Sequence, residues 1–171
     1  MTRVAYQSHR GIVILATILS ASIFAQVPVL ASTEVITSRV DIVAAYCGKT
    51  SDQFHATITG TLGNDVLIGT KGNDLIIGLE GNDRINGYRG NDCIFGNEGN
   101  DNIRGNQGAD IVDGGEGMDT IFGETGADVI LGGADNDRLS GGPGSDMLDG
   151  GTGSDSCSGG AGVDFVLNCE P

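Results

Sequence analysis

The sequence contains no tryptophan, three tyrosines, five phenylalanines, three prolines and two histidines. It is also poor in positive charge: nine lysines and arginines stand against 23 aspartates and glutamates, for a formal net charge of −14. Nucleic acid is therefore an unsuitable partner, because phosphate binding needs clustered cations. The lack of tryptophan, together with 30 glycines, favours one elongated domain over several.

The usual catalytic motifs are missing as well. There is no H-E-x-x-H zinc helix, no G-x-S-x-G nucleophile elbow and no EF-hand loop with its closing glutamate. The many glycines do not form a dinucleotide-binding fingerprint, which needs a single glycine-rich turn between a strand and a helix. After residue 31 the sequence has one histidine, His55, which suits a structural or surface role better than catalysis. We therefore expect a protein that is not an enzyme.

The sequence does contain a nine-residue repeat, which occurs twelve times without insertion or deletion over residues 60–167. Position one is glycine in all twelve copies, and position four is glycine in eleven. Position eight is aliphatic in eleven copies, with Cys157 as the exception. A period held this long indicates a solenoid, in which each repeat buries its apolar residue by stacking on its neighbours.

The repeat predicts an all-β fold. Its first six residues indicate a tight turn, because glycine accepts backbone conformations that other residues avoid. Its last three residues indicate a minimal strand, whose middle side chain faces one way and whose flanking side chains face the other. Two repeats then make one 18-residue coil. We expect about six coils forming a parallel β-roll with two short-stranded parallel sheets, roughly 29 Å long at about 4.8 Å per strand.

Position six decides the chemistry, because it is aspartate in every copy. Copies two apart lie above one another, so each wall carries a ladder of carboxylates roughly 5 Å apart. Such close like charges repel, and the repeats hold too few cations to neutralise them. Hard oxygen ligands in glycine-rich turns select Ca²⁺ over zinc or copper. The candidate metal ligands are Asp65, Asp74, Asp83, Asp92, Asp101, Asp110, Asp119, Asp128, Asp137, Asp146, Asp155 and Asp164.

Copies such as GGPGSDMLD, GGTGSDSCS and GGAGVDFVL resemble the G-G-x-G-x-D-x-U-x repeat of the RTX, or haemolysin-type calcium-binding, family. The resemblance covers residues 60–167. It implies that the position-six aspartates and nearby turn carbonyls bind Ca²⁺ between successive coils. Each site needs one copy and the copy two further on, and twelve copies form ten such pairs. We therefore expect up to about ten calcium ions.

The sequence also departs from that pattern. Position two is glycine in five copies, whereas threonine, leucine, tyrosine, asparagine or glutamate stands there in the other seven. Asp135 replaces the position-four glycine of the ninth copy, and we expect the weakest calcium site in that turn.

Residues 1–31 resemble a signal peptide. Two arginines precede an apolar run over residues 11–25, and Ala31 ends a stretch suited to cleavage, with Ala25 as second choice. The alternative is an uncleaved membrane anchor, because residues 11–31 are long enough to span, although a glutamine and a proline interrupt them. We expect export to an oxidising, extracellular location and no stable membrane span in the mature chain.

The rest of the chain covers the ends of the roll. Residues 32–59 are interpreted as an N-terminal cap, which an open solenoid needs, and residues 168–171 form a short tail. The outward strand residues of even copies are mainly apolar, with Asp113 and Asp149 the only charges, whereas those of odd copies are mainly polar. An apolar sheet face normally has a cover.

Four cysteines in a short exported chain favour disulfides and allow three pairings. Cys93 points outward on the apolar wall, where Cys47 reaches it if the cap folds over that wall. Cys157 faces inward near the far end, close to Cys169 in the tail. We therefore expect Cys47–Cys93 and Cys157–Cys169, with four free buried thiols as the alternative.

These features leave three functions open. The first is a secreted calcium-binding protein whose folding follows Ca²⁺. The second is a structural or adhesive protein, in which the apolar wall docks a protein partner or a second copy. The third is an accessory module of a secreted hydrolase. Circular dichroism with and without Ca²⁺ tests the first function, and sedimentation tests the second.

Overall fold

The structure is a computed structural model, and it describes residues 47–170. The predicted signal peptide, residues 1–31, and the first part of the predicted cap, residues 32–46, lie outside the described residues. The elements are a 3-10 helix and thirteen strands: η2 (Ser51–Gln53), β1 (Ala56–Thr59), β2 (Val66–Ile68), β3 (Asp74–Glu80), β4 (Arg84–Arg89), β5 (Cys93–Glu98), β6 (Asn102–Gln107), β7 (Ile111–Glu116), β8 (Thr120–Thr125), β9 (Val129–Ala134), β10 (Arg138–Pro143), β11 (Met147–Thr152), β12 (Ser156–Ala161) and β13 (Phe165–Leu167).

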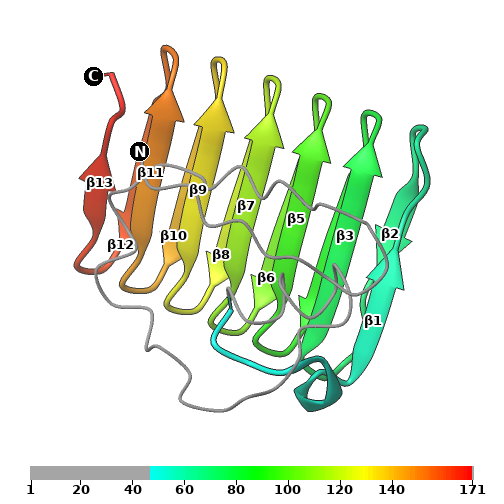
Figure 1. The fold of residues 1–171 in the computed structure, drawn as a ribbon. Helices are drawn as coiled ribbons and strands as arrows, with labels where there is room; N and C mark the ends of the chain where they lie inside the picture. Colours follow the sequence, from blue (N-terminus) through cyan, green and yellow to red (C-terminus); the bar gives the residue numbers. More distant parts are fainter. Residues whose placement is uncertain (1–46, 171) are drawn as a thin grey trace, which may run out of the picture. The chain divides into compact units, whose positions relative to one another are not determined.

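The strands form two parallel sheets that the chain visits alternately (Figure 1). Sheet A has seven strands in the order β1-β3-β5-β7-β9-β11-β13, and sheet B has six in the order β12-β10-β8-β6-β4-β2. Paired residues are 18 apart throughout, as in Ile76 with Ile94 and Ile85 with Ile103. The predicted parallel β-roll of about six 18-residue coils is confirmed. No helix within residues 47–170 is long and apolar enough to cross a membrane.

Most strands are longer than the three residues that the sequence predicted. Strand β5, for example, runs through six residues and continues past the position-one glycine, Gly96, into the next repeat. Pairing skips that glycine and resumes at position two, where Asn97 pairs with Gly115. The chain therefore bends at positions one and two while staying in the sheet, and the turn proper is confined to positions four to six.

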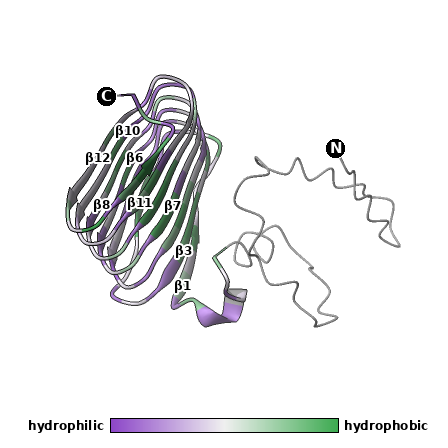
Figure 2. Ribbon diagram, turned by 90° about the vertical axis from the view of Figure 1, so that its left-hand side faces the viewer, coloured by the Kyte–Doolittle hydropathy of each residue, from purple (hydrophilic) through white to green (hydrophobic). Residues whose placement is uncertain are grey.

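The position-eight side chains meet between the two sheets and make one continuous core. Most of them have no exposed surface, because each is covered by the coil above, the coil below and the facing sheet. In Figure 2 the apolar segments run along the strands, and the turns are mostly polar. The core consists of Leu67, Ile76, Ile85, Ile94, Ile103, Val112, Ile121, Ile130, Leu139 and Leu148, with Ile58 and Cys157 packed against it.

The described part of the cap extends the roll and covers one corner of it. Strand β1 pairs with β3 and so adds a strand to sheet A before the first repeat. Phe54 packs against Leu75, Ile77 and Cys93 on the outer face of that sheet. These residues are almost fully buried, so the apolar wall predicted from the even copies has a cover at its first strands.

Two disulfides tie the ends of the chain to the roll. Cys47 is bonded to Cys93 on β5, with 6.3 Å between their Cα atoms, and Cys157 on β12 is bonded to Cys169, with 5.9 Å. These are the pairs that the sequence analysis expected. Residues 47–170 contain no free cysteine.

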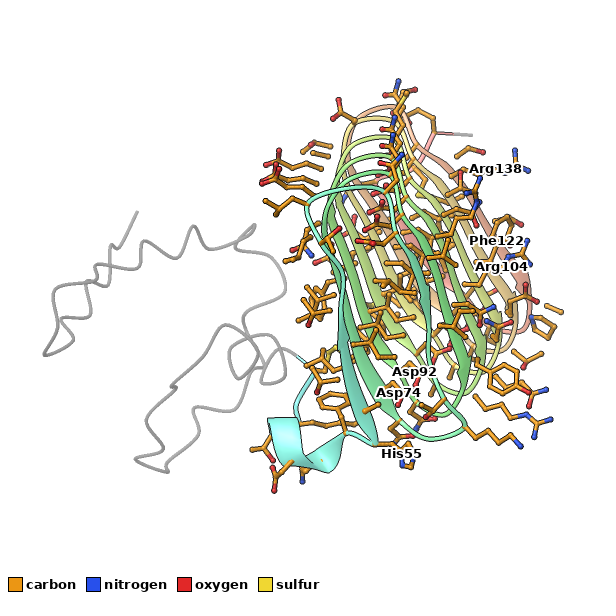
Figure 3. The ribbon with its side chains drawn as sticks, turned by 90° about the vertical axis from the view of Figure 1, so that its right-hand side faces the viewer. His55, Asp74, Asp92, Arg104, Phe122 and Arg138 are labelled. Atoms are coloured by element: carbon orange, nitrogen blue, oxygen red, sulfur yellow. A yellow bond between two sulfur atoms is a disulfide. The ribbon has the colours of Figure 1, made fainter. Side chains whose placement is uncertain are left out.

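The outer face of sheet B is mainly polar, as expected from the odd copies, although Val66 and Ile68 on β2 are exposed apolar residues. Arg104, Phe122 and Arg138 project from it (Figure 3). The Arg104 guanidinium lies 5.0 Å from the centre of the Phe122 ring and 3.1 Å from the Glu124 carboxylate. Phe122 is therefore partly covered by a neighbouring charged side chain.

Candidate metal centre

The twelve position-six aspartates occupy the turns and point into the roll. Ten of them have at most 3% of their surface exposed, whereas Asp65 and Asp164, at the two ends, are half-buried. Asp74 and Asp92, which are labelled in Figure 3, lie in two successive coils at the same edge of the roll. The structure therefore brings the predicted ligands together as two ladders of buried carboxylates, one beside each sheet.

One oxygen of ten of the twelve carboxylates, from Asp83 to Asp164, joins neighbouring coils. The Oδ1 atom of an aspartate accepts a hydrogen bond from the backbone N–H of the aspartate 18 residues earlier, as from Asp83 to Asp101, at 2.8 Å. Ten such bonds, of 2.8 to 3.0 Å, join Asp65 through Asp146 to their successors. Position six is thus a structural requirement as well as a source of charge.

The second oxygen of the same carboxylates has no partner in nine turns. These buried Oδ2 atoms accept no hydrogen bond, although an unpaired buried charged oxygen is strongly unfavourable. So many orphaned oxygens, one per turn and always the same atom, point to a missing partner that is positively charged. They belong to Asp83, Asp92, Asp101, Asp110, Asp119, Asp128, Asp137, Asp146 and Asp155.

A backbone carbonyl converges on each of these oxygens. A Cβ placed on Gly96 would meet both the Asp101 Oδ2 and the carbonyl oxygen of Gly114, one coil further on. The same two kinds of oxygen lie within 3.0 Å of the Cβ position at ten glycines, from Gly60 to Gly141. Position one must therefore be glycine for space, not for an unusual φ, because any side chain would fill the cradle between the two oxygens.

The electrostatics agree with the need for a counter-charge. Burial raises the pKa of Asp92 and Asp110 to about 7 and that of Asp119 to about 8, although a hydrogen bond from a backbone N–H opposes the shift. The charges of neighbouring aspartates raise these pKa values further. The pKa values of Asp101 and Asp128 rise to about 6 for the same principal reason. The column is therefore hard to ionise fully at neutral pH unless a cation enters it.

The donor set suits a hard cation. No group of three or more histidine, cysteine, aspartate or glutamate side chains within residues 47–170 is arranged to hold a metal. A cation in these turns would take one carboxylate from its own turn and most of its remaining ligands from backbone carbonyls. Ca²⁺ accepts such a set of six to eight oxygens with flexible geometry, so the residues fit this ion.

The first two turns differ from the others in a way that sequence reasoning missed. Thr61 donates its backbone N–H to Asp65 Oδ2 at 2.6 Å and its hydroxyl to the same oxygen at 2.9 Å. Thr70 donates its backbone N–H to Asp74 Oδ2 at 2.5 Å and its hydroxyl to Oδ1 at 3.0 Å. These carboxylates already have partners. In the sequence, the threonine at position two could have indicated these bonds, because its hydroxyl is a hydrogen-bond donor four residues before the aspartate.

Position two also sets the bend of the chain after the position-one glycine. In ten copies its φ is positive, whether the residue is glycine, as in Gly115 (φ 111°), or a larger residue, such as Leu79 (φ 86°) or Tyr88 (φ 82°). Thr61 and Thr70 are the two exceptions. Asp135 at position four also has a positive φ, of 75°, whereas the glycines with positive φ at this position have values of 117° to 154°.

Asparagines at position five add a second ladder outside the aspartates. The Asn82 Oδ1 accepts the backbone N–H of Asn100 at 2.7 Å, and Asn64 and Asn91 make equivalent bonds one coil on. These bonds lie mainly in the first half of the roll, where asparagine stands at position five of the first five copies. They stabilise neighbouring turns without contributing charge.

Comparison with known protein families gives one match. The model of the RTX calcium-binding nonapeptide repeat matches the chain in four copies, at residues 59–92, 90–121, 113–148 and 131–166. The matched span covers more than half of the 171 residues. A search of the curated proteins finds no match.

Proposed function

The chain belongs to the RTX calcium-binding nonapeptide repeat family, and on this premise we propose that it is a secreted protein whose β-roll folds when Ca²⁺ enters its turns. Bound calcium supplies the positive charge that the aspartate column lacks. The chain contributes the rest: Oδ1 joins one coil to the next, Oδ2 presents negative charge, and the position-one glycine leaves room for a carbonyl from the following coil. Repeats of this family typically form a structural calcium-binding domain, and we propose no catalytic activity.

The observation that carries this proposal is the set of nine orphaned Oδ2 atoms. A roll stabilised by its core alone would gain from a neutral residue at position six, because leaving a buried charge unpaired is costly. Aspartate nevertheless occupies this position in all twelve copies. A cation between coils explains both the charge and its burial.

We propose all twelve position-six aspartates as calcium ligands, with unequal contributions. Of the up to about ten ions expected from the repeat count, the two nearest the N-terminus should bind most weakly, because threonine donors already satisfy Asp65 and Asp74. The turn containing Asp135 is a further weak candidate, since its backbone must hold a bulkier residue at a positive φ.

Calorimetric titration of the purified protein with Ca²⁺ tests the function. We expect several ions to bind per chain, and Asp101→Asn to lower the number by at least one because it removes the charge but keeps the hydrogen-bond acceptor. Asp52→Asn is the matched control, since this exposed residue lies outside the column and should leave the number unchanged. Absence of calcium binding by the unmodified protein, under conditions where it is pure and monodisperse, would contradict the proposal.

Secretion is supported by the disulfides, which persist in oxidising compartments. Mass spectrometry of the exported protein is the test. We expect an N-terminus at Ser32, after removal of residues 1–31. An exported protein that retains Met1 would show that the apolar segment is an anchor or is not processed.

A structural or adhesive role is a second candidate, favoured by apolar side chains on the last strand. Phe165 and Leu167 of β13 are 69% and 51% exposed on the outer face of sheet A. A protein partner or a second copy that packs there would bury them. Sedimentation of the calcium-loaded protein distinguishes the candidates, because a monomer at all concentrations argues against self-association through this wall.

A further inference from the structure

The repeat ends at residue 167, yet one turn beyond the regular pattern is still complete. At ten position-one glycines the converging carbonyl comes from the glycine 18 residues later. Gly150 and Gly159 have no repeat above them. Over Gly150, however, the carbonyl oxygen of Asn168 takes the usual place beside Asp155 Oδ2, whereas over Gly159 the three nearest atoms all belong to Asp164. The tail therefore continues one ladder and leaves the other open.

Glu170 reproduces the aspartate of a missing thirteenth copy. Its backbone N–H donates to the Asp155 carbonyl at 2.9 Å, as the position-seven residue Phe165 does to Asp146 at 2.8 Å. Glu170 therefore stands where position seven would be, one residue beyond the aspartate position. Its longer side chain reaches back, and Oε2 accepts the Asp155 N–H at 2.5 Å. In every earlier coil an aspartate Oδ1 makes this contact, as Asp155 does for Asp137.

The second disulfide holds this arrangement. Cys169 lies between the two residues that imitate the repeat, and it is bonded to Cys157, which occupies position eight of the eleventh copy. Glu170 also forms an isolated parallel bridge with Ser156 on β12. The tail is thus fixed against the edge of sheet B by a covalent bond and by backbone hydrogen bonds.

An unpaired atom points into the resulting gap. Asp155 is 2% exposed, and its Oδ2 has no hydrogen-bond partner. The Asn168 carbonyl faces the same point above Gly150. The turn of Asp155 thus has the pair of oxygens found between regular coils, although the second one comes from outside the repeat.

We propose that Asn168 and Glu170 complete a terminal Ca²⁺ site on the turn Gly150–Asp155, so that the chain binds one ion more than its repeats alone provide. The proposal rests on the proposed function, because it assumes that the regular turns bind Ca²⁺. The site offers two carboxylates and a backbone carbonyl, all hard oxygen ligands. The opposite ladder gains no such ion, because the tail places no carbonyl above Gly159.

Native mass spectrometry of the calcium-loaded protein tests this, because it counts bound ions as integers. Glu170→Gln removes the charge and keeps a hydrogen-bond acceptor, and we expect it to bind one ion fewer than the unmodified protein. Glu98→Gln is the control, since Glu98 is an exposed glutamate at position three of a regular repeat and its loss changes the net charge equally. It should bind the same number as the unmodified protein.

The outcomes separate this proposal from the function on which it rests. Equal counts for Glu170→Gln and the unmodified protein across the calcium range overturn the terminal site while leaving the regular sites intact. No bound calcium in any of the three proteins overturns the function itself. One ion fewer in Glu170→Gln alone supports the terminal site.

A second variant tests the disulfide that positions the tail. Cys157→Val with Cys169→Ser removes the bond, and valine suits a position that is Val112 in another copy. We expect the terminal ion to leave at a higher free calcium concentration than in the unmodified protein, while the remaining ions are retained. A calcium dependence identical to that of the unmodified protein would show that the tail does not hold the ion.

Discussion

Two columns of buried side chains run the length of the roll, one aliphatic and one acidic. Ile103 has no exposed surface, and Asp101, two residues earlier in the same repeat, is 3% exposed. Burial of the isoleucine stabilises the roll by about 1.5 to 3 kcal/mol. Burial of the ionised aspartate costs several kcal/mol unless a partner compensates, on the order of magnitude known for buried charges. The same geometry thus buries one group that favours folding and one that opposes it.

The difference between the columns explains how a roll can depend on an ion. The aliphatic column favours stacking whatever the solvent contains. The acidic column makes stacking conditional, because its nine orphaned oxygens are unfavourable in the core unless a cation or a proton neutralises them. Substitutions in the two columns should therefore respond differently to calcium.

The largest effect should come from pH. In the folded, calcium-free protein the pKa of Asp92 is about 7 and that of Asp119 is about 8, both above the ordinary value of 3.8. The folded state then binds protons that the unfolded state releases. The stability that these protonated carboxyls add to the calcium-free roll should therefore be fully present below about pH 4 and be lost as the pH rises toward 8. With calcium the slope should reverse, because protons compete with the ion.

Thermal unfolding between pH 4 and pH 8, in chelator with a stabilising osmolyte and in excess calcium with the same osmolyte, measures both slopes. The calcium-free melting temperature should fall with rising pH, and the calcium-loaded one should rise. Parallel slopes in the two conditions would mean that the aspartates do not carry the calcium dependence.

A smaller effect is expected in the aliphatic column. Ile103→Ala should destabilise the calcium-loaded protein by about 2 to 5 kcal/mol, because it removes buried atoms and leaves a cavity between two coils. Urea unfolding in saturating calcium measures the loss. Since Ile103 lies in the apolar core, the number of bound calcium ions should not change. A lower number would show that the aliphatic column also affects calcium binding.

Next comes the neighbouring position in the acidic column. Asp101→Asn should cost about 1.4 to 2.7 kcal/mol in calcium at 10 to 100 times the dissociation constant, because one ion is lost. Without calcium the same change should stabilise the roll by roughly 1 to 3 kcal/mol at pH 8, because it removes a buried unpaired charge. Unfolding in chelator with a stabilising osmolyte gives the second value. The decisive feature is the change of sign, and destabilisation in both conditions would contradict it.

The smallest effect should come from a residue in neither column. Tyr88→Gly should stabilise the protein by about 0.5 to 1 kcal/mol, because relief of a positive φ outweighs the greater freedom of glycine in the unfolded chain. Tyr88→Ala keeps the backbone strain and is the control. Both values should be alike with and without calcium, and a marked calcium dependence would show that position two also shapes the metal site.

The periodic part of this molecule was predictable from its residues. A strict nine-residue period determines which side chains stack, so the coil length, the parallel sheets and the two ladders of aspartates followed from counting. The cysteine pairs followed as well, because alternation along a strand showed that Cys93 faces outward and Cys157 inward.

What escaped prediction depends on local geometry that no period expresses. The strands extend past the position-one glycine because pairing can skip a residue at a bend, which a pattern of side-chain types does not reveal. Thr61 and Thr70 occupy a variable position, and their role emerges from hydrogen bonds to an aspartate four residues on. Glu170 lies one residue beyond the place of the aspartate in a further coil, and its longer side chain reaches back to make the aspartate's hydrogen bond. A search for the nine-residue pattern therefore does not find it.

The central claim is that cations in the aspartate column decide whether the roll forms. Circular dichroism of the purified protein at pH 8, first in chelator and then during titration with Ca²⁺, tests it most directly. We expect little strand signal in chelator and a cooperative rise to the full signal as calcium is added. A full strand signal in chelator, unchanged by calcium, would contradict the claim.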